Sequence, residues 1–344
     1  MGAIFSEAFF LTKKGEANDA FDLRKFELNL PVGTEVLIEV ESFGLNYADV
    51  MARKGLYREA PAFPCIVGYE VVGKIAHVGP DADQSKLGKR VVAFCRFGGY
   101  AKHVITNDHA TVDIGTQSAE ELLALCTQAV TAFYMAEYLV PVHKVDTVLI
   151  HAAAGGVGTM LIQLAKLKGA RVIAKVGRQE KEGLVKKLGA DIVVNYNTSD
   201  YQEQIKKALN GERIDISYNP VAGSTFKKDF ALLGSGGRMV LFGGSELSNG
   251  KWGMLSKLNF LRKMGLIIPI GLMMRSKNIL GVNLLKIADN KPKVLEFCMQ
   301  SVVNLYSEGK IKPQIGCVYK ATQLAEAHSA LERGETTGKL IVNW

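Results

Sequence analysis

A glycine-rich turn at residues 151–158, HAAAGGVG, has the composition of a phosphate-binding loop between a strand pattern and a helix pattern. A missing side chain at Gly155 lets the backbone approach a pyrophosphate, and at Gly158 it lets the helix pack closely on the strand. The first helical turn adds unpaired N–H groups and the positive end of the helix dipole. Ala153 replaces the first glycine of G-x-G-x-x-G, so the strand–turn–helix context carries the prediction of a dinucleotide site. The expected contacts come from Ala154, Gly155, Gly156, Val157 and Gly158.

Cations stand where the second strand of this unit should end. Enzymes that use NAD place an acid there, about 20 residues after the turn, to bind the ribose 2′-hydroxyl. Residues 171–179 contain no acid, and Arg178 and Lys181 stand there instead. Both cations suit a 2′-phosphate, to which Tyr196 after the third strand could add a hydroxyl. We therefore predict NADPH as the cofactor; the alternative is that both cations are ordinary surface charges.

Alternating strand and helix patterns surround the turn. The strand patterns occupy residues 147–153, 170–177, 191–196, 213–221 and 237–244, and the helix patterns occupy 157–169, 180–189, 201–211 and 225–234. Short connections between alternating elements indicate a parallel sheet with helices on both faces. The predicted fold class is α/β, with a Rossmann doubly wound parallel sheet.

Both ends of the chain depart from this alternation. Residues 1–120 are rich in β-branched residues and are punctuated by glycines, which is typical of strands. After residue 285 come a helix pattern at 291–311 and two short strand patterns separated by another helix. We therefore predict a β-rich domain made of residues 1–126 plus 289–344, into which the Rossmann domain, residues 127–288, is inserted.

The composition narrows the class of protein. A length of 344 residues suggests two domains, and the net charge of +8 is not concentrated in a long Lys/Arg block. We therefore expect no nucleic-acid partner. The 5 cysteines form no C-x-x-C pair, which argues against a disulfide framework and for a reducing compartment. A cytoplasmic location is expected.

Residues 264–274, MGLIIPIGLMM, come nearest to a membrane span, and Arg262, Lys263 and Arg275 flank them. A spanning helix needs about 20 apolar residues, so this segment is too short. Three interpretations remain open: it lines a pocket or a subunit interface, it packs in the core, or it makes peripheral contact with a membrane.

Several stretches together resemble the medium-chain dehydrogenase/reductase superfamily, and within it the zinc-free quinone oxidoreductase branch. They are residues 44–57, 64–80, 125–134, 151–158, 188–196 and 237–244. Residues 275–287 and 305–315 also resemble vesicle amine transport protein homologues, a subgroup associated with membranes and with uncertain reductase activity. The resemblance covers nearly the whole chain. It implies a GroES-like catalytic domain at the chain ends and a homodimer.

The resemblance also bears on metal content. Zinc enzymes of the superfamily carry a Cys and a His where this chain has Asn46 and Tyr69, so we expect no metal site. Without a Lewis acid, oxidation of an alcohol has little support. Quinones and α,β-unsaturated carbonyl compounds accept hydride at carbon, and hydrogen-bond donors can stabilise the charge that develops on oxygen. The predicted function is a zinc-independent, NADPH-dependent oxidoreductase acting on a small hydrophobic electrophile.

Site residues follow from the same resemblance. Asn46 and Tyr57 match residues that line the nicotinamide cleft, and Tyr47 is a third polar group on that loop. The alternatives are that Asn46 only braces the loop and that Tyr47 belongs to the core. Asp49 is expected to orient the loop rather than to act as a base.

Further cofactor contacts are expected from Thr131, which matches a residue near the nicotinamide amide, and from Phe242 and Gly243 in the stretch GRMVLFGG. The alternative function is a membrane- or lipid-associated nucleotide-binding protein with little or no reductase activity. Its support is the basic charge, the apolar segment at 264–274 and the narrower resemblance.

Overall fold

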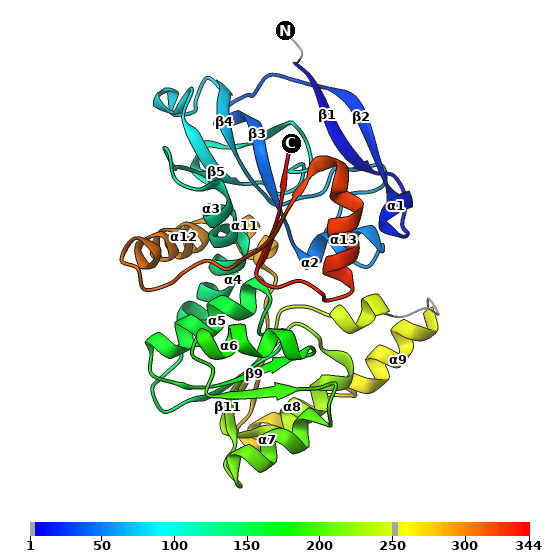
Figure 1. Cartoon of the computed structure of the whole chain (residues 1–344), viewed down its shortest axis with the longest axis vertical. Coiled ribbons are helices and arrows are strands. Elements are labelled where there is room, and N and C mark those ends of the chain that lie inside the picture. Colours follow the sequence, from blue (N-terminus) through cyan, green and yellow to red (C-terminus); the bar gives the residue numbers. More distant parts are fainter. Residues whose placement is uncertain (1–3, 250–253) are drawn as a thin grey trace. The chain divides into compact units, whose positions relative to one another are not determined.

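The computed structural model describes residues 4–249 and 254–344 (Figure 1). The chain divides into two compact units, Met1–Gln128 with Pro313–Trp344, and Ala129–Lys312. Residues 289–312 therefore belong to the second unit, whereas the sequence placed them with the first. The physical reason is that α12 (Pro292–Ser307) packs on α4 (Val130–Phe133), with the Phe297 and Phe133 rings 6.1 Å apart.

The second unit is built on a six-stranded sheet in which each neighbouring pair of strands is parallel. The strand order is β10 (Ile192–Asn195), β9 (Arg171–Val176), β8 (Thr147–Ile150), β11 (Ile214–Asn219), β12 (Leu233–Leu241), β13 (Asn278–Gly281). All four residues of β8 are buried, as expected of a central strand covered on both faces. The prediction of a doubly wound parallel sheet is confirmed.

Helices cover both faces of this sheet. Figure 1 shows α5 (Gly156–Leu167) and α6 (Glu182–Lys187) on one side of the strands, with α7 (Tyr201–Leu209) and α8 (Phe226–Leu232) on the other. The chain changes faces between β10 and β11, so β8 and β11 are neighbours at the switch point. In such sheets a ligand binds at the carboxyl ends of the strands beside that point.

The remaining helices of this unit are α9 (Met254–Met264), α10 (Pro269–Arg275) and α11 (Leu284–Asn290). β13 ends at Gly281, and α11 begins three residues later. The Asn283 side chain accepts a hydrogen bond from Lys286 N and so caps α11. Residues 264–274 lie at the end of α9 and in α10, and most of them are exposed; Leu266 is 90% exposed. Packing in the core of one subunit therefore does not account for them.

The first unit contains a seven-stranded sheet with the path β14-β15-β3-β4-β5-β7, and β6 pairs with β3. Its strands are β3 (Glu35–Leu45), β4 (Glu70–Val78), β5 (Arg90–Phe94), β6 (His103–Asn107), β7 (Thr111–Asp113), β14 (Ile315–Lys320) and β15 (Lys339–Asn343). The antiparallel pair β1 (Ile4–Leu11) and β2 (Phe21–Leu28) stands apart. Its helices are α1 (Ala17–Ala20), α2 (Tyr47–Arg53), α3 (Ala119–Ala124) and α13 (Leu324–Glu332). The predicted β-rich domain made from both chain ends is thus observed.

Ala119–Leu139 is a helix of 21 residues that is long and apolar enough to cross a membrane by length and composition. Of its most apolar window, 78% is buried inside the protein, as in a core helix. Two π-helical turns, Leu125–Ala129 and Tyr134–Leu139, flank α4 within it. Such turns are rare in helices and often lie at functional sites.

Candidate active site and cofactor site

The turn after β8 has the geometry of a phosphate cradle. Ala152 adopts a φ of +48°, and Gly155 N donates to the Ala152 carbonyl at 2.9 Å, which folds the chain sharply back. A Cβ at Gly158 would lie 2.5 Å from Ala152 O, so only glycine allows this approach. α5 then begins at Gly156 with no side-chain cap, which leaves its first N–H groups available to an anion. The turn therefore fits a pyrophosphate.

The carboxyl end of β11 forms the other side of the switch point. Asn219 Oδ1 accepts hydrogen bonds from Val221 N and Ala222 N at 2.8 and 2.9 Å, and Ala222 adopts a φ of +57°. Non-glycine residues in the left-handed region are costly and often mark functional sites. The expected cofactor residues Phe242 and Gly243 follow β12 at this edge, and a Cβ at Gly243 would lie 2.7 Å from Pro220 O.

The end of β9 and the loop after β10 are joined at Gly177. Tyr196 N donates to Val176 O at 3.1 Å, and the Asn197 side-chain amide donates to Gly177 O. A Cβ at Gly177 would collide with the Tyr196 hydroxyl, so this glycine makes room for it. Arg178 is the next residue, and the exposed turn that it begins ends at Lys181. The structure therefore brings the Tyr196 hydroxyl to the backbone beside Arg178.

In the first unit, Asn46 belongs to a buried hydrogen-bonded network. Its amide nitrogen donates to Glu70 Oε1 at 2.8 Å, and its oxygen accepts from Lys339 Nζ at 3.1 Å. Lys339 also binds Glu70 directly, and Thr127 N donates to Glu70 Oε2 at 2.6 Å. Asn46 is only 6% exposed and both ends of its amide are engaged. These contacts show Asn46 bracing its loop, which was the alternative role; direct contact with substrate stays a prediction.

Asp49 is fully buried on α2 and accepts a hydrogen bond from Asn46 N at 2.8 Å, so it orients the loop as expected. Burial raises the pKa of the Asp49 carboxyl to about 7, although the Asn46 bond and Lys339 favour the charged form. Nearby, the Tyr100 hydroxyl lies 3.0 Å from His328 Nε2, and burial lowers the pKa of His328 to about 3. The imidazole is therefore neutral at pH 7.

Tyr57 and Tyr69 meet edge to face, with ring centroids 6.4 Å apart. Tyr69 is 2% exposed and Tyr57 is half-buried in the loop after α2. Burial raises the pKa of the Tyr57 phenol to about 12, so it remains a proton-bearing hydrogen-bond donor across the physiological range. The contact of Tyr57 with a ligand stays a prediction.

The other predicted residues are distributed as follows. Tyr47 begins α2 and is half-buried. This degree of burial does not decide between the two roles considered for it, contact with a ligand and packing in the core. Thr131 lies on α4, 9% exposed, between the two π-helical turns of that helix. Within the described ranges 4–249 and 254–344, no group of three or more His, Cys, Asp or Glu residues is arranged to hold a metal ion.

Sequence reasoning missed a set of buried polar residues beside the predicted ones. They are Glu70 and Lys339 in the first unit, and His151, Lys175 and Asp229 in the second. Each is fully or almost fully buried, and each lies in or next to a strand or helix. A signal was present, because His151 and Lys175 interrupt the apolar runs TVLIHAA and ARVIAKVG. Charged residues are rarely buried unless they are paired.

Comparisons with known proteins agree with this geometry. Residues 33–119 match the alcohol dehydrogenase GroES-like domain, and residues 156–298 match the zinc-binding dehydrogenase family. The chain is 29% identical over 320 residues to the quinone oxidoreductase of Homo sapiens, which covers 91% of this chain and 90% of that protein. It is 28% identical over 310 residues to the synaptic vesicle membrane protein VAT-1 homolog of Danio rerio. That alignment covers 90% of this chain but 64% of the relative, so the chain spans less than two thirds of its length.

Among solved structures, quinone oxidoreductase of Escherichia coli complexed with NADPH is similar to this chain. The TM-score is 0.86 at 25% identity, and the match covers 98% of this chain and 100% of the other. The two-unit architecture is therefore shared over essentially the full length.

Proposed function

The chain belongs to the medium-chain dehydrogenase/reductase superfamily, as the resemblance predicted, and we propose that it is an oxidoreductase that uses NADPH to reduce quinones or α,β-unsaturated carbonyl compounds without zinc. This proposal rests on two features at the carboxyl ends of neighbouring parallel strands. One is the turn after β8 that ends at Gly158, and the other is Gly177 after β9, against which the Tyr196 hydroxyl lies. Their spacing along one βαβ unit is that of a dinucleotide site.

NADPH fits this edge better than NADH. The α5 N-terminus would hold the pyrophosphate, and Arg178, Lys181 and Tyr196 would hold the 2′-phosphate. No acid stands at the end of β9 to accept a hydrogen bond from a free ribose hydroxyl. The similar Escherichia coli enzyme complexed with NADPH supports this assignment.

We propose a reduction because the Tyr57 phenol is a hydrogen-bond donor, and such donors stabilise the negative charge that a reduction places on oxygen. When bound, NADPH supplies a hydride to an electrophilic carbon, and negative charge then develops on the substrate oxygen. The Tyr57 phenol, with its pKa near 12, would donate a hydrogen bond to that oxygen. Asn46, held by Glu70 and Lys339, would fix the start of α2, the helix that precedes the loop of Tyr57. The final proton would come from water.

Zinc independence is part of the proposal. By the resemblance, Asn46 and Tyr69 stand where zinc enzymes place a Cys and a His, and neither is an ordinary zinc ligand. Asn46 is moreover committed to Glu70 and Lys339. The match of residues 156–298 to a zinc-binding dehydrogenase family describes the fold of that region and does not by itself imply a zinc site.

Charge reversal tests the cofactor assignment. Arg178→Glu with Lys181→Glu should weaken NADPH binding by about 100-fold while NADH binding changes little, because only NADPH carries the 2′-phosphate. Lys206→Glu, an exposed lysine on α7, is the control and should leave both unchanged. Equal loss of both cofactors in the double variant would contradict the assignment.

We also propose a homodimer. β13 is the outer strand of the six-stranded sheet, and within the described residues no strand pairs with its other edge. Exposed sheet edges are templates for pairing with a second chain. Ile279→Pro, in the middle of β13, should disrupt this edge and halve the mass measured in solution, whereas Val145→Ser, at a site 88% exposed, should leave the mass unchanged. A cytoplasmic location remains a prediction.

A second candidate function, peripheral membrane contact, is favoured by one observation. The exposed apolar side chains of α9, α10 and their link are Leu255, Leu258, Leu261, Leu266, Ile267, Ile268, Ile270, Met273 and Met274. The cations among and beside them are Lys257, Arg262, Lys263, Arg275 and Lys277, and no acid occurs between Glu246 and Asp289. Apolar side chains flanked by cations suit an anionic membrane surface.

Liposome binding tests this second candidate. The chain should sediment with vesicles that contain anionic lipid and not with neutral vesicles. Leu266→Ser with Ile268→Ser should abolish sedimentation, whereas Val145→Ser, at a site 88% exposed elsewhere on the same unit, should not. Unchanged sedimentation of the double variant would reject the segment as the contact.

A further inference from the structure

Lys175 is a buried lysine near the proposed 2′-phosphate site. It lies in β9, is 5% exposed, and has no assigned role in cofactor binding. Its ammonium lies 3.2 Å from His151 Nδ1 and over the rings of Tyr201 and Tyr196, at 4.0 and 4.8 Å from their centroids. Within the described part of the chain, no carboxylate forms an ion pair with it. A buried cation without a direct anion is costly, so its position calls for an explanation.

The nearest buried acid, Asp229, is already saturated with donors. Its Oδ2 accepts from Ser217 Oγ and Asn219 Nδ2, both at 2.7 Å, and lies 2.8 Å from His151 Nε2. Its Oδ1 accepts from the Tyr201 hydroxyl at 2.7 Å. Burial opposes ionisation, but the neighbouring His151 and these donors hold the pKa of the carboxyl below its ordinary value. Asp229 therefore reaches Lys175 only through the imidazole of His151.

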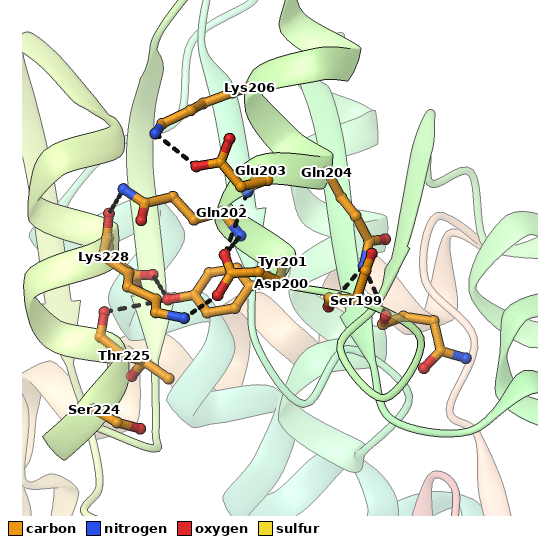
Figure 2. A network of polar contacts seen from close by, with 12 residues as sticks. Ser199, Asp200, Tyr201, Gln202, Glu203, Gln204, Lys206, Ser224, Thr225 and Lys228 are labelled. Carbon is orange, nitrogen blue, oxygen red and sulfur yellow. Dashed lines mark hydrogen bonds and ion pairs between the residues drawn. The ribbon is translucent and has the colours of Figure 1, made fainter.

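The outer charges around Lys175 are paired with each other. Lys228 on α8 binds Asp200 at the start of α7, as Figure 2 shows, with the Tyr201 side chain beside them. Glu246, beyond β12, binds Lys263. Burial lowers the pKa of His151, so the imidazole is neutral at pH 7 and can accept an N–H from Lys175 at Nδ1.

Tyr196 connects Lys175 to the proposed phosphate site. The Lys175 ammonium contacts the Tyr196 ring, and the hydroxyl of that ring lies at Gly177, two residues further along β9. Arg178 and Lys181 follow Gly177 and would contact the phosphate from solvent. The ring of Tyr196, which is 50% exposed, thus contacts the buried Lys175 ammonium while its hydroxyl reaches the backbone beside Arg178.

We propose that Lys175 is a buried cation of the 2′-phosphate site and that it takes up a proton when the phosphate monoester binds. This inference rests on the proposed NADPH site. Burial lowers the pKa of the free lysine to about 8, so a large fraction is neutral at that pH. A phosphate dianion nearby favours the charged form and draws a proton from solvent. The protonated lysine then adds to the preference for NADPH over NADH. If Lys175 only braced Tyr196 and Tyr201, binding would be proton-neutral.

Calorimetry with cofactor fragments tests this without turnover. Binding of 2′,5′-ADP and of 5′-AMP is measured at pH 8, in two buffers of different ionisation enthalpy, on the full-length protein. At this pH the 2′-phosphate is already a dianion and contributes no proton itself. For the native protein we expect uptake of on the order of half a proton with 2′,5′-ADP and almost none with 5′-AMP.

Variants separate the two roles of Lys175. Lys175→Met should abolish the uptake and lower the preference for 2′,5′-ADP about tenfold. Lys175→Arg, which stays charged, should keep the preference and lose the uptake, and it covers the case that Lys175→Met does not fold. Lys206→Met on α7 is the control and should behave as the native protein. If Lys175→Met or Lys175→Arg keeps the native uptake, the inference is overturned while the phosphate site stands. If the native protein does not prefer 2′,5′-ADP, the phosphate site fails and this inference fails with it.

Discussion

Lys339 and Glu70 form an ion pair in which neither side chain is exposed to solvent. The pair joins β15 near the C-terminus to β4, and Asn46 bridges both partners. The start of α2 is therefore held by a residue almost 300 positions away in the sequence. A second lysine, Lys175, is buried in the other unit without such a direct partner.

Loss of the ammonium at Lys339 should strongly destabilise the protein. Lys339→Met leaves the Glu70 carboxylate buried without its counter-charge, and such losses cost about 3–5 kcal/mol. The free energy of unfolding in urea measures this. The control is Lys102→Met at the Lys102–Glu7 pair, where both side chains are partly exposed and the cost should stay below about 1 kcal/mol. Equal costs at the two sites would show that the buried pair is not special.

Asp49 should make stability fall as the pH rises. Its pKa is raised to about 7 in the folded protein, so the folded state binds more protons than the unfolded state between pH 4 and 7. Stability from this group is therefore full below the unfolded pKa and is lost as pH rises through 7, by up to about 4 kcal/mol. Asp49→Asn should flatten the unfolding free energy between pH 5 and 8. An unchanged slope in the variant would refute the raised pKa.

Tyr57 should act on the chemical step rather than on binding. Tyr57→Phe removes the phenolic donor with little change in shape, and kcat should fall by about 10- to 100-fold with a small change in KM. Tyr138→Phe, at a site 48% exposed on the second unit, should leave kcat unchanged. A Tyr57→Phe enzyme with native kcat would remove Tyr57 from the reaction.

Gly177 should be required for the Tyr196 hydroxyl to reach the phosphate site. In Gly177→Ala the new methyl group collides with that hydroxyl, so the ring must move and NADPH binding should weaken about tenfold. Gly183→Ala is the matched control, because a Cβ there meets nothing within 4 Å. The dissociation constants of the two variants for NADPH and for NADH measure this effect. Weakening at Gly183 equal to that at Gly177 would mean that the effect is not local.

The parallel sheet and the phosphate turn could be predicted because their signals are local. The TVLI run, Gly155 and Gly158 specify a strand, a close approach and a helix start within one short stretch. The end of the second unit, which we expected near residue 289, could not be predicted in this way. It depends on the packing of Phe297 against Phe133, which is far away in the sequence. The network around Asn46 depends likewise on Lys339, and the sequence of its strand gives no sign that this lysine is buried and paired. Long-range pairing of buried charges leaves no periodic pattern.

The proposed reductase activity is measured by steady-state oxidation of NADPH in the presence of a panel of quinones and enones, with NADH run in parallel. We expect saturable turnover with at least one such acceptor, unaffected by a zinc chelator, and a kcat/KM for NADPH about tenfold or more above that for NADH. Tight NADPH binding with no turnover of any acceptor would rule out the proposed reductase activity, and an equal kcat/KM for the two cofactors would rule out the preference for NADPH.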